Sequence, residues 1–393
     1  MKLYCTQRGR DVEVIVNDEM TLYVCGVTPY DSAHTGHLAM AAVYDVIARR
    51  LRARGARVRV VRNITDVDDP LLPRAEQLNI PYWDLVEAEI AQWMADTRRL
   101  GLACDVEPRA SEHIDGMITA IEEMAAAGLT YEMDGTVYFR VSRDRAYGGL
   151  SHYDEAQMVA AARERGGDPD RSGKEAPLDF VLWQPSRPGE PEYASPFGRG
   201  RPGWHIGCSV MSRRHCGPRV DIHGGGADLV FPHHECEAAQ DRGMDGSRVG
   251  IWFHSALLDY RGEKMSKSRG NIVLARDLLD KHDPMVVRLA ALGSYSPRRG
   301  GEWRDGHVDE AAERLDRWRR AARAESGPAP ERFEEAFFAR LDDNVELPDA
   351  IGVADELAGD ILAGRGSDAR GPVALRSFLK VLGLDGATED RGR

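Results

Sequence analysis

The chain has 393 residues, of which 42% are hydrophobic and 30% charged, and its net charge is −12. This length predicts two or three domains with ample core and excludes a small disulfide-stapled scaffold. No apolar run approaches the roughly 18 residues that a membrane span needs, and the first residues lack a signal-peptide apolar stretch, so we expect a cytoplasmic protein. The acidic balance argues against a protein that coats nucleic acid, because phosphate neutralisation needs clustered Lys and Arg.

Residues 21–63 have the pattern of one β-α-β unit. A strand at 21–25 leads into a turn rich in breakers and N-capping residues, then a helix at about 36–54 that ends at Gly55, then a strand at 58–61. Such a unit predicts a parallel sheet with a ligand crevice at the carboxyl ends of its strands. We therefore expect the α/β class, with a Rossmann-like nucleotide-binding domain.

Later segments predict an interruption of this sheet. Helices are expected at 82–99 and 113–127, a strand at 136–141, surface loops at 163–202, strands at 219–223 and 251–255, and helices from residue 295 to the end. The expected division is a first catalytic half (1–100), a connective insertion (101–202), a second catalytic half (203–255), a lysine-loop linking region (256–300) and a C-terminal helical domain (301–393).

The string His34-Thr35-Gly36-His37 stands where the turn after the first strand enters the helix. Helix N-termini present free N–H groups and a partial positive charge, and two imidazoles there add donors aimed at a polyphosphate. Alone, the string fits two surface histidines equally well. Its place inside a β-α-β unit favours phosphate binding.

A second string, Lys264-Met265-Ser266-Lys267-Ser268, lies in a polar segment bounded by glycines. Two lysines three residues apart can close over phosphates and stabilise a pyrophosphate leaving group, although a short Lys/Ser loop alone is usually just solvated. Together, in this order, the two strings resemble the signature pair of class I aminoacyl-tRNA synthetases. The resemblance implies ATP with Mg²⁺ as substrate and catalytic roles for His34, His37, Lys264 and Lys267.

The six cysteines form no compact pattern, which argues against a disulfide framework and leaves metal ligation open for a subset. Cys25 ends the first strand, Cys208 lies far along the chain, and His233 and Glu237 would share one face of a helix. Two thiolates, an imidazole and a carboxylate suit tetrahedral Zn²⁺. The alternative to metal ligation is that the cysteines are buried in the core as small apolar side chains. His234 is the alternative imidazole, about 100° away on such a helix.

This set resembles the zinc site of the cysteinyl-tRNA synthetases and their paralogues, in which the metal takes the substrate thiolate as a ligand. The resemblance implies one Zn²⁺ per chain, held by Cys25, Cys208, His233 and, as a weaker ligand, Glu237. A site that demands a sulfur–metal bond rejects serine, whereas size alone separates near-isosteres by only about 1–3 kcal/mol.

Further matches fill the pocket that the resemblance implies. Trp204 would form an apolar wall beside the cysteine side chain, and Asp228 would accept hydrogen bonds from ribose hydroxyls. The alternative to a substrate contact at each of these positions is a structural role, either in a turn or in core packing. The residues expected to contact substrate or adenylate are Cys25, Gly26, Val27, Thr28, Met40, Asn63, Ile64, Thr65, Trp204, Gly226, Ala227, Asp228 and Leu258.

Within this group, four features favour the mycothiol cysteine ligases over the tRNA enzymes. They are the turn at 28–31 (Thr-Pro-Tyr-Asp), His37 in place of a common Asn, the stretch Glu-Arg-Gly-Gly-Asp-Pro at 164–169, and a chain that ends about 125 residues after the lysine loop, with an acidic tail and no evident anticodon-binding module. Three residues depart from the ligase pattern: Met40 replaces a usual Thr, Gly207 a usual Glu and Leu258 a common Val. These departures bear on adenylate affinity and on the identity of the amine acceptor.

The resemblance implies a two-step ligase. ATP would activate L-cysteine to cysteinyl-AMP, and the amine of glucosaminyl-inositol would then take the cysteinyl group as an amide, a step of mycothiol biosynthesis. The alternatives are a cysteinyl-tRNA synthetase with a shortened C-terminal region and a non-catalytic paralogue that binds adenylate or metal. We expect cysteine, ATP and an amino sugar as partners, no tRNA or membrane, and a monomer.

Overall fold

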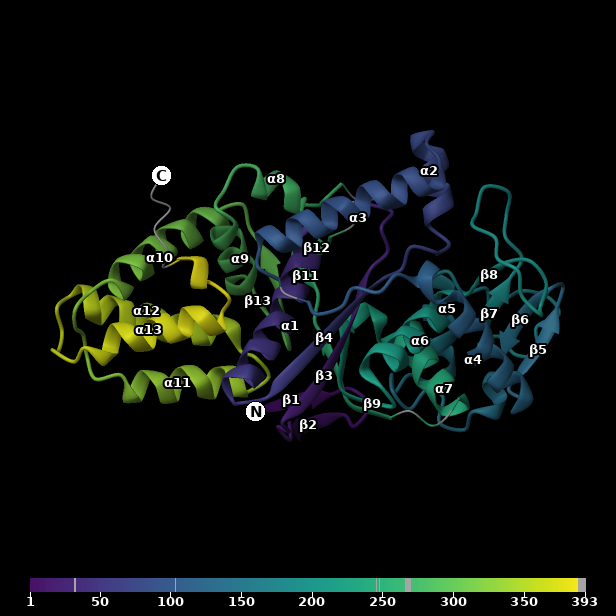
Figure 1. Cartoon of the computed structure of the whole chain (residues 1–393), viewed down its shortest axis with the longest axis horizontal. Coiled ribbons are helices and arrows are strands. Elements are labelled where there is room, and N and C mark those ends of the chain that lie inside the picture. The colour runs from purple at the N-terminus through teal and green to yellow at the C-terminus, as the bar shows by residue number, and fades with distance from the viewer. Residues whose placement is uncertain (32, 103, 245, 247, 266–269, 388–393) are drawn as a thin grey trace.

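A computed structural model describes residues 1–387, apart from residues 32, 103, 245, 247 and 266–269. Its centre is a four-stranded sheet in the order β10-β9-β3-β4 (Figure 1). The strands are β3 (Glu19–Val27), β4 (Arg57–Ile64), β9 (Arg219–Gly226) and β10 (Arg248–Ser255), and every neighbouring pair is parallel. The predicted α/β class and parallel sheet are confirmed.

Helix α1 (Thr35–Ala53) connects β3 to β4 and buries a continuous apolar side. The buried side chains include Tyr44, Ile47 and Leu51, at the three- and four-residue spacing of one helix face. Tyr44 of the same helix packs so closely on β9 that a Cβ at Gly224 would lie 2.2 Å from its ring. This packing places the N-terminus of α1 at the carboxyl end of β3, where a nucleotide crevice is expected.

The chain between β4 and β10 adds helices and a second sheet, at the right of Figure 1. The helices are α2 (Leu71–Leu78), α3 (Tyr82–Arg99), η1 (Ala110–His113), α4 (Ile114–Ala126), η2 (Val141–Arg143), α5 (Glu155–Glu164), α6 (Trp204–Cys216), η3 (Ala227–Leu229), η4 (Val230–His234) and α7 (Glu235–Gly243). The antiparallel sheet contains β5 (Thr130–Met133), β6 (Thr136–Phe139), β7 (Phe180–Gln184) and β8 (Arg201–Pro202). The prediction of loops alone over 163–202 was wrong, because β7 is a short strand buried on both faces and lacks an alternating pattern.

The C-terminal third forms a small sheet near the middle of Figure 1 and a helical bundle at its left. The sheet contains β11 (Leu258–Tyr260), β12 (Glu263–Lys264), β13 (Tyr295–Ser296) and β14 (Gly300–Trp303). The helices are α8 (Ala275–Leu279), α9 (Pro284–Gly293), α10 (His307–Ala322), α11 (Glu331–Asp342), α12 (Leu347–Leu362), α13 (Arg370–Val381) and η6 (Asp385–Ala387). The helical tail is confirmed, whereas β13, β14 and the N-terminal hairpin of β1 (Lys2–Cys5) and β2 (Arg10–Glu13) were not predicted.

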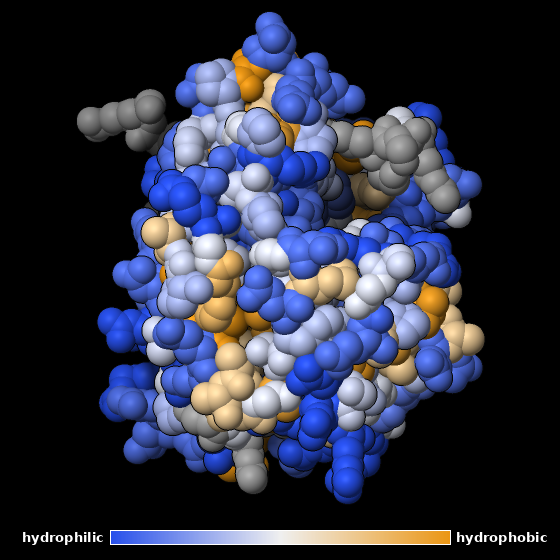
Figure 2. Space-filling model, turned by 90° about the vertical axis from the view of Figure 1, so that its right-hand side faces the viewer, coloured by the Kyte–Doolittle hydropathy of each residue, from blue (hydrophilic) through white to orange (hydrophobic). Residues whose placement is uncertain are grey.

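Arg288 of α9 fixes this bundle to the sheet layer. Its guanidinium is fully buried and donates hydrogen bonds to the Asp45 carboxylate of α1 and to the carbonyls of Leu100 and Leu382. No described helix is long and apolar enough to span a bilayer. The face in Figure 2 is largely hydrophilic with small apolar groups, as is usual for a surface in contact with water.

Candidate active site and metal centre

A crevice of about 790 Å³ lies where the first strand turn meets the N-terminus of α1. Its walls also come from the loop after β4, from the start of α6 and from β12. The residues expected from the sequence that line it are Gly26, Val27, Thr28, His34, His37, Trp204, Asp228 and Lys264. The predicted crevice at this end of the parallel strands is therefore present.

Four donor side chains from distant segments converge beside this crevice. Cys25, Cys208, His233 and Glu237 each offer one ligand atom, and these atoms all lie within 4.8 Å of one another. Nε2 of His233 is 3.4 Å from Cys208 Sγ and 3.0 Å from Glu237 Oε1, while Cys25 Sγ is 3.5 Å from the same oxygen. All four side chains are buried. The four residues that the sequence singled out can thus share one ion.

A second set, Cys25, His223, His234 and Glu237, meets the same distance condition. His234 Nε2 lies 3.2 Å from Cys25 Sγ, so the expectation that its ring would face elsewhere was wrong. The reason is local: Phe231 has extended backbone angles (φ −138°, ψ 134°) and the segment is not a regular α-helix before Glu235. His223 was missed, although a histidine preceding three glycines at the end of a buried strand was a usable signal.

Burial sets the charge of this cluster. It lowers the pKa of the His223 and His234 imidazoles, and neighbouring imidazoles lower both further, so these rings are neutral and can offer lone pairs. The hydrogen bond from the Cys25 thiol lowers the pKa of Cys208 well below its usual value, which makes Cys208 the thiolate of the pair. Burial raises the pKa of Glu237.

The cluster also contains an unsatisfied atom that a cation would satisfy. Oε2 of Glu237 is buried, lies 3.4 Å from Nε2 of His223 and makes no hydrogen bond to any described residue. Buried polar atoms without partners are rare in folded proteins. Together with a donor set of sulfur, nitrogen and oxygen, this observation fits a divalent metal ion.

His34 and His37 form the N-terminal cap of α1 with stacked rings, whose centroids are 3.9 Å apart. Nδ1 of His34 accepts from the Gly36 N–H and Nδ1 of His37 from the His34 N–H. Burial lowers the pKa of His34 to about 2 and also lowers that of His37, so both rings are neutral. With Nδ1 accepting, each ring carries its proton on Nε2, and that N–H is left to donate to a phosphate.

Lys264 lies at the mouth of the crevice, where its Nζ is 3.0 Å from Asp228 Oδ2. Asp228, whose carboxylate was expected to accept hydrogen bonds from the ribose hydroxyls, is therefore paired with Lys264 in this structure. Met265 anchors the segment, because its sulfur accepts a hydrogen bond from the Thr35 hydroxyl of α1. Lys267 lies outside the described residues.

The other expected contact residues divide into two groups. Met40, Gly226 and Leu258 line a smaller cavity of about 160 Å³ that shares His37 and Lys264 with the crevice. Asn63, Ile64, Thr65 and Ala227 line neither cavity. Asn63 instead accepts from the Gly26 N–H (3.0 Å) and donates to Thr65 (2.9 Å), so it fixes the end of β3 against β4. A Cβ at Gly26 would lie 1.9 Å from the Asn63 carbonyl oxygen, which explains why glycine is needed there.

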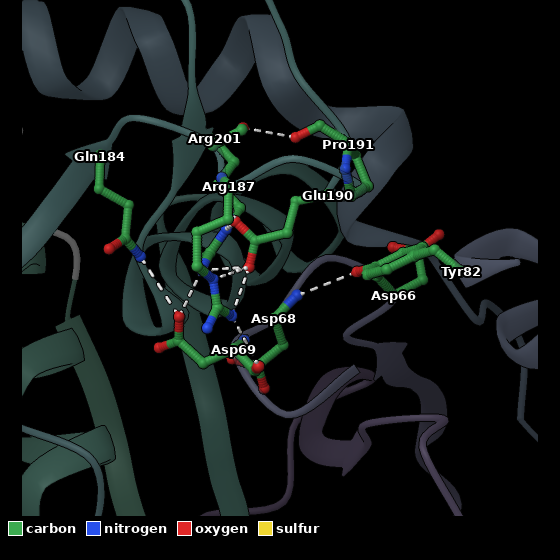
Figure 3. A network of polar contacts seen from close by, with 10 residues as sticks. Asp66, Asp68, Asp69, Tyr82, Gln184, Arg187, Glu190, Pro191 and Arg201 are labelled. Carbon is green, nitrogen blue, oxygen red and sulfur yellow. Dashed lines mark hydrogen bonds and ion pairs between the residues drawn. The ribbon is translucent and has the colours of Figure 1, made fainter. Parts of the chain in front are cut away.

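Two aspartates of the loop after β4 were not singled out from the sequence. Asp68 lines the crevice, is buried and accepts from the Thr28 hydroxyl at 3.1 Å. Burial, with the charge of Asp69, raises the pKa of Asp68 to about 7. Asp69 pairs with buried Arg201, which also holds Glu190 (Figure 3). This network ties the crevice to the inserted sheet.

Comparison with known proteins decides the family. The family model for the tRNA synthetases class I (C) catalytic domain matches residues 11–299. The chain belongs to this class I synthetase family. Among curated proteins, the L-cysteine:1D-myo-inositol 2-amino-2-deoxy-alpha-D-glucopyranoside ligase of Streptosporangium roseum is 39% identical over 388 residues, covering 97% of this chain and 94% of that protein. The protein of the same name from Kribbella flavida is 42% identical over 364 residues, covering 91% and 89%.

Solved structures agree at the level of the fold. The chain superposes on Mycobacterium tuberculosis methionyl-tRNA synthetase in complex with methionyl-adenylate with a TM-score of 0.67, 17% identity and coverage of 93% of this chain and 90% of that one. A putative arginyl tRNA synthetase from Campylobacter jejuni gives a TM-score of 0.56, 14% identity and coverage of 95% and 92%. The resemblance predicted from the two signature strings is confirmed.

Proposed function

We propose that this chain activates L-cysteine with ATP and transfers the cysteinyl group to the amine of glucosaminyl-inositol. One observation carries the proposal: a buried Cys/Cys/His/Glu cluster lies next to a crevice lined by His34, His37 and Lys264. The names of the ligases from Streptosporangium roseum and Kribbella flavida support the choice of acceptor. The cytoplasmic location, the monomeric state and the five-part domain division stay predictions.

We propose Zn²⁺ as the ion, held by Cys25, Cys208, His233 and Glu237. When bound, it would take the thiolate of the substrate cysteine as a ligand and so exclude serine. The stack of Trp204 on His233, with centroids 4.4 Å apart, would place an apolar wall beside that cysteine. His223 and His234 complete a ring of neutral imidazoles that keeps this end of the pocket free of competing positive charge.

In the first step, the carboxylate of cysteine would attack the α-phosphate of ATP·Mg²⁺. An O–P bond forms, the bond to the pyrophosphate breaks and cysteinyl-AMP results. No protein nucleophile is needed, so acceleration comes from position and charge. The Nε2–H groups of His34 and His37 would donate to the phosphates, and Lys264 and Lys267 would stabilise the leaving pyrophosphate.

In the second step, the neutral amine of the amino sugar would attack the carbonyl carbon of the mixed anhydride. A C–N bond forms, the C–O bond to AMP breaks with its electron pair leaving on AMP, and one amine proton is lost. The product is an amide, whereas a tRNA synthetase would form an ester on a ribose hydroxyl.

A cysteinyl-tRNA synthetase is the second candidate, favoured by the family model at residues 11–299. Both candidates catalyse cysteine-dependent ATP–pyrophosphate exchange. The decisive experiment gives the enzyme tRNA or glucosaminyl-inositol in separate reactions and identifies the cysteinylated product by mass spectrometry. We expect an amide of the amino sugar and no charged tRNA; charging of tRNA alone would overturn the proposal, and a lack of any exchange would indicate a non-catalytic paralogue.

A further inference from the structure

A second cavity, of about 400 Å³, adjoins the crevice on the side of the inserted sheet. The two share four lining residues, Asp69, Arg165, Gly166 and Trp204. The second cavity also has His205 in its wall, whose Nδ1 is 2.9 Å from Nδ1 of His233. It therefore lies on the side of His233 away from the other metal ligands, and it opens onto the crevice at Trp204.

We propose that this cavity is the acceptor subsite and that it takes an uncharged, polyhydroxylated ring attached to the attacking amine. The inference rests on the proposed function. An amine that attacks an acyl-adenylate must come within contact distance of its carbonyl carbon, so the rest of the acceptor must occupy adjoining space. The volume lies within the roughly 300–1,000 Å³ typical of small-molecule sites.

The other described cavities suit the acceptor less well. The cavity of about 160 Å³ adjoins the crevice but lies at Met40 and Leu258, on the side of His34 and Lys264 away from Trp204. A third cavity, of about 360 Å³ and lined by Thr119 and Arg213 among others, shares no lining residue with the crevice. Of these three cavities, only the second combines contact with Trp204 and sufficient volume.

The lining indicates the chemistry of the ligand. Aromatic rings of Tyr147, Phe180 and Trp204 offer flat apolar faces, and charged side chains of both signs surround them. Hydroxyl groups both donate and accept, so a polyol needs such a mixture. The carboxylate of Asp168, at the exposed edge, accepts no hydrogen bond from any described residue, whereas the Lys174 ammonium donates to the carbonyls of Asp168 and Pro177.

The cations of the cavity are already engaged, which argues against a phosphorylated acceptor. Arg171 donates to the Tyr138 hydroxyl and lies 3.8 Å from Asp134, Arg165 donates to the Phe231 carbonyl, and Arg187 pairs with Glu190. A phosphate would compete with each of these partners. The N–H groups of these arginines that are not yet used can donate to neutral hydroxyls, and the existing contacts with Tyr138, Phe231 and Glu190 then stay intact.

The test fills the cavity without touching the crevice. Leu178→Trp places a large ring among the lining residues, and Thr119→Trp does the same in the unconnected third cavity as a matched control. We expect Leu178→Trp to raise the KM for glucosaminyl-inositol at least 10-fold, with cysteine-dependent ATP–pyrophosphate exchange within twofold of wild type. Thr119→Trp should change neither quantity.

Two further measurements keep the inference testable if Leu178→Trp fails to fold. Asp168→Asn should raise the acceptor KM several-fold with unchanged exchange. In the wild type, free myo-inositol should inhibit amide formation in competition with glucosaminyl-inositol and leave exchange unaffected. Wild-type acceptor KM in both variants, or inhibition by inositol that does not compete with the acceptor, would overturn the subsite while leaving the proposed function intact. A wild type that makes no amide would instead contradict the proposed function itself.

Discussion

Nε2 of His233 lies 3.4 Å from Sγ of Cys208, although the two residues belong to different elements and are 25 positions apart. Cys208 lies on α6, and His233 reaches it from a short irregular helix after β9. The contact exists because α6 packs against η4 and against α7, which follows η4 directly. The cluster therefore depends on tertiary packing, and a ligand can be removed without disturbing any single element.

Cys208→Ser should remove most of the bound metal and abolish cysteine activation. Changes in groups that merely support a ligand cost about 10–100-fold in metal affinity, so loss of a ligand atom should cost at least that much. Metal content per chain, measured by elemental analysis, and cysteine-dependent ATP–pyrophosphate exchange check this. Cys216→Ser, on the same helix but outside both ligand sets, is the matched control. If the Cys208→Ser enzyme kept its full zinc content and full activity, the assignment of Cys208 as a metal ligand would be wrong.

Lys264→Ala should slow formation of cysteinyl-AMP by about 10²–10³-fold, the usual cost of removing one donor aimed at developing charge. Binding of cysteine should change less than twofold, because Lys264 pairs with Asp228 and belongs to neither set of metal ligands. Lys267→Ala should behave in the same way. Single-turnover rates and cysteine titrations separate the two effects, with Lys281→Ala on an exposed turn as control. An unchanged single-turnover rate would contradict this role.

Asp68 should make the protein less stable as the pH rises from about 4 to 7. Burial raises its pKa in the folded chain to about 7, so the folded state holds a proton that the unfolded chain has lost. The stability is complete below the unfolded pKa of about 3.9 and is lost as the pH rises through 7. Asp68→Asn cannot ionise, and its free energy of unfolding relative to wild type should increase by about 1–3 kcal/mol between pH 5 and pH 8. Denaturant unfolding at both values, with Asp84→Asn on the exposed side of α3 as control, measures the difference.

Local signals were enough to find the parallel sheet and much of the site. The apolar run of β3, the breakers after it and the amphipathic α1 lie within 45 residues, so periodicity and capping identify them. Helical spacing relates His233 to Glu237, but no spacing rule relates that pair to Cys25 and Cys208, and the resemblance supported joining all four. The structure brings these four together and leaves Asn63 and Thr65 behind Gly26, away from the crevice.

What sequence reasoning missed depends on contacts between distant segments. The raised pKa of Asp68 comes from burial that only the packed loop creates, so composition gives no sign of it. His234 was assigned to the wrong face because helical periodicity was applied before a regular helix begins. Strand β7 was missed because the side chains on both of its faces are buried or half-buried, with α6 packed against it, and such a strand has no alternating pattern.

Arg201 is the residue whose loss should most disturb the junction between insertion and crevice. Its guanidinium, 3% exposed, lies between the buried Glu190 carboxylate and Asp69 (Figure 3). Arg201→Ala leaves Glu190 buried without its main partner, and breaking such a pair costs about 3–5 kcal/mol. Denaturant unfolding should show this loss, whereas Arg163→Ala, in an exposed surface pair with Asp170, should leave stability nearly unchanged.

The pH dependence of this effect gives an independent check. Burial alone would raise the pKa of Glu190, but hydrogen bonds from Arg201 and Arg187 lower it to about 2. A lowered carboxyl pKa stabilises the fold above its unfolded value of about 4.3, and that contribution disappears as the pH falls towards 2. The stability difference between wild type and Arg201→Ala should therefore shrink on acidification from pH 6 to pH 3. A difference that stays constant over this range would mean that Arg201 acts through packing and not through its charge.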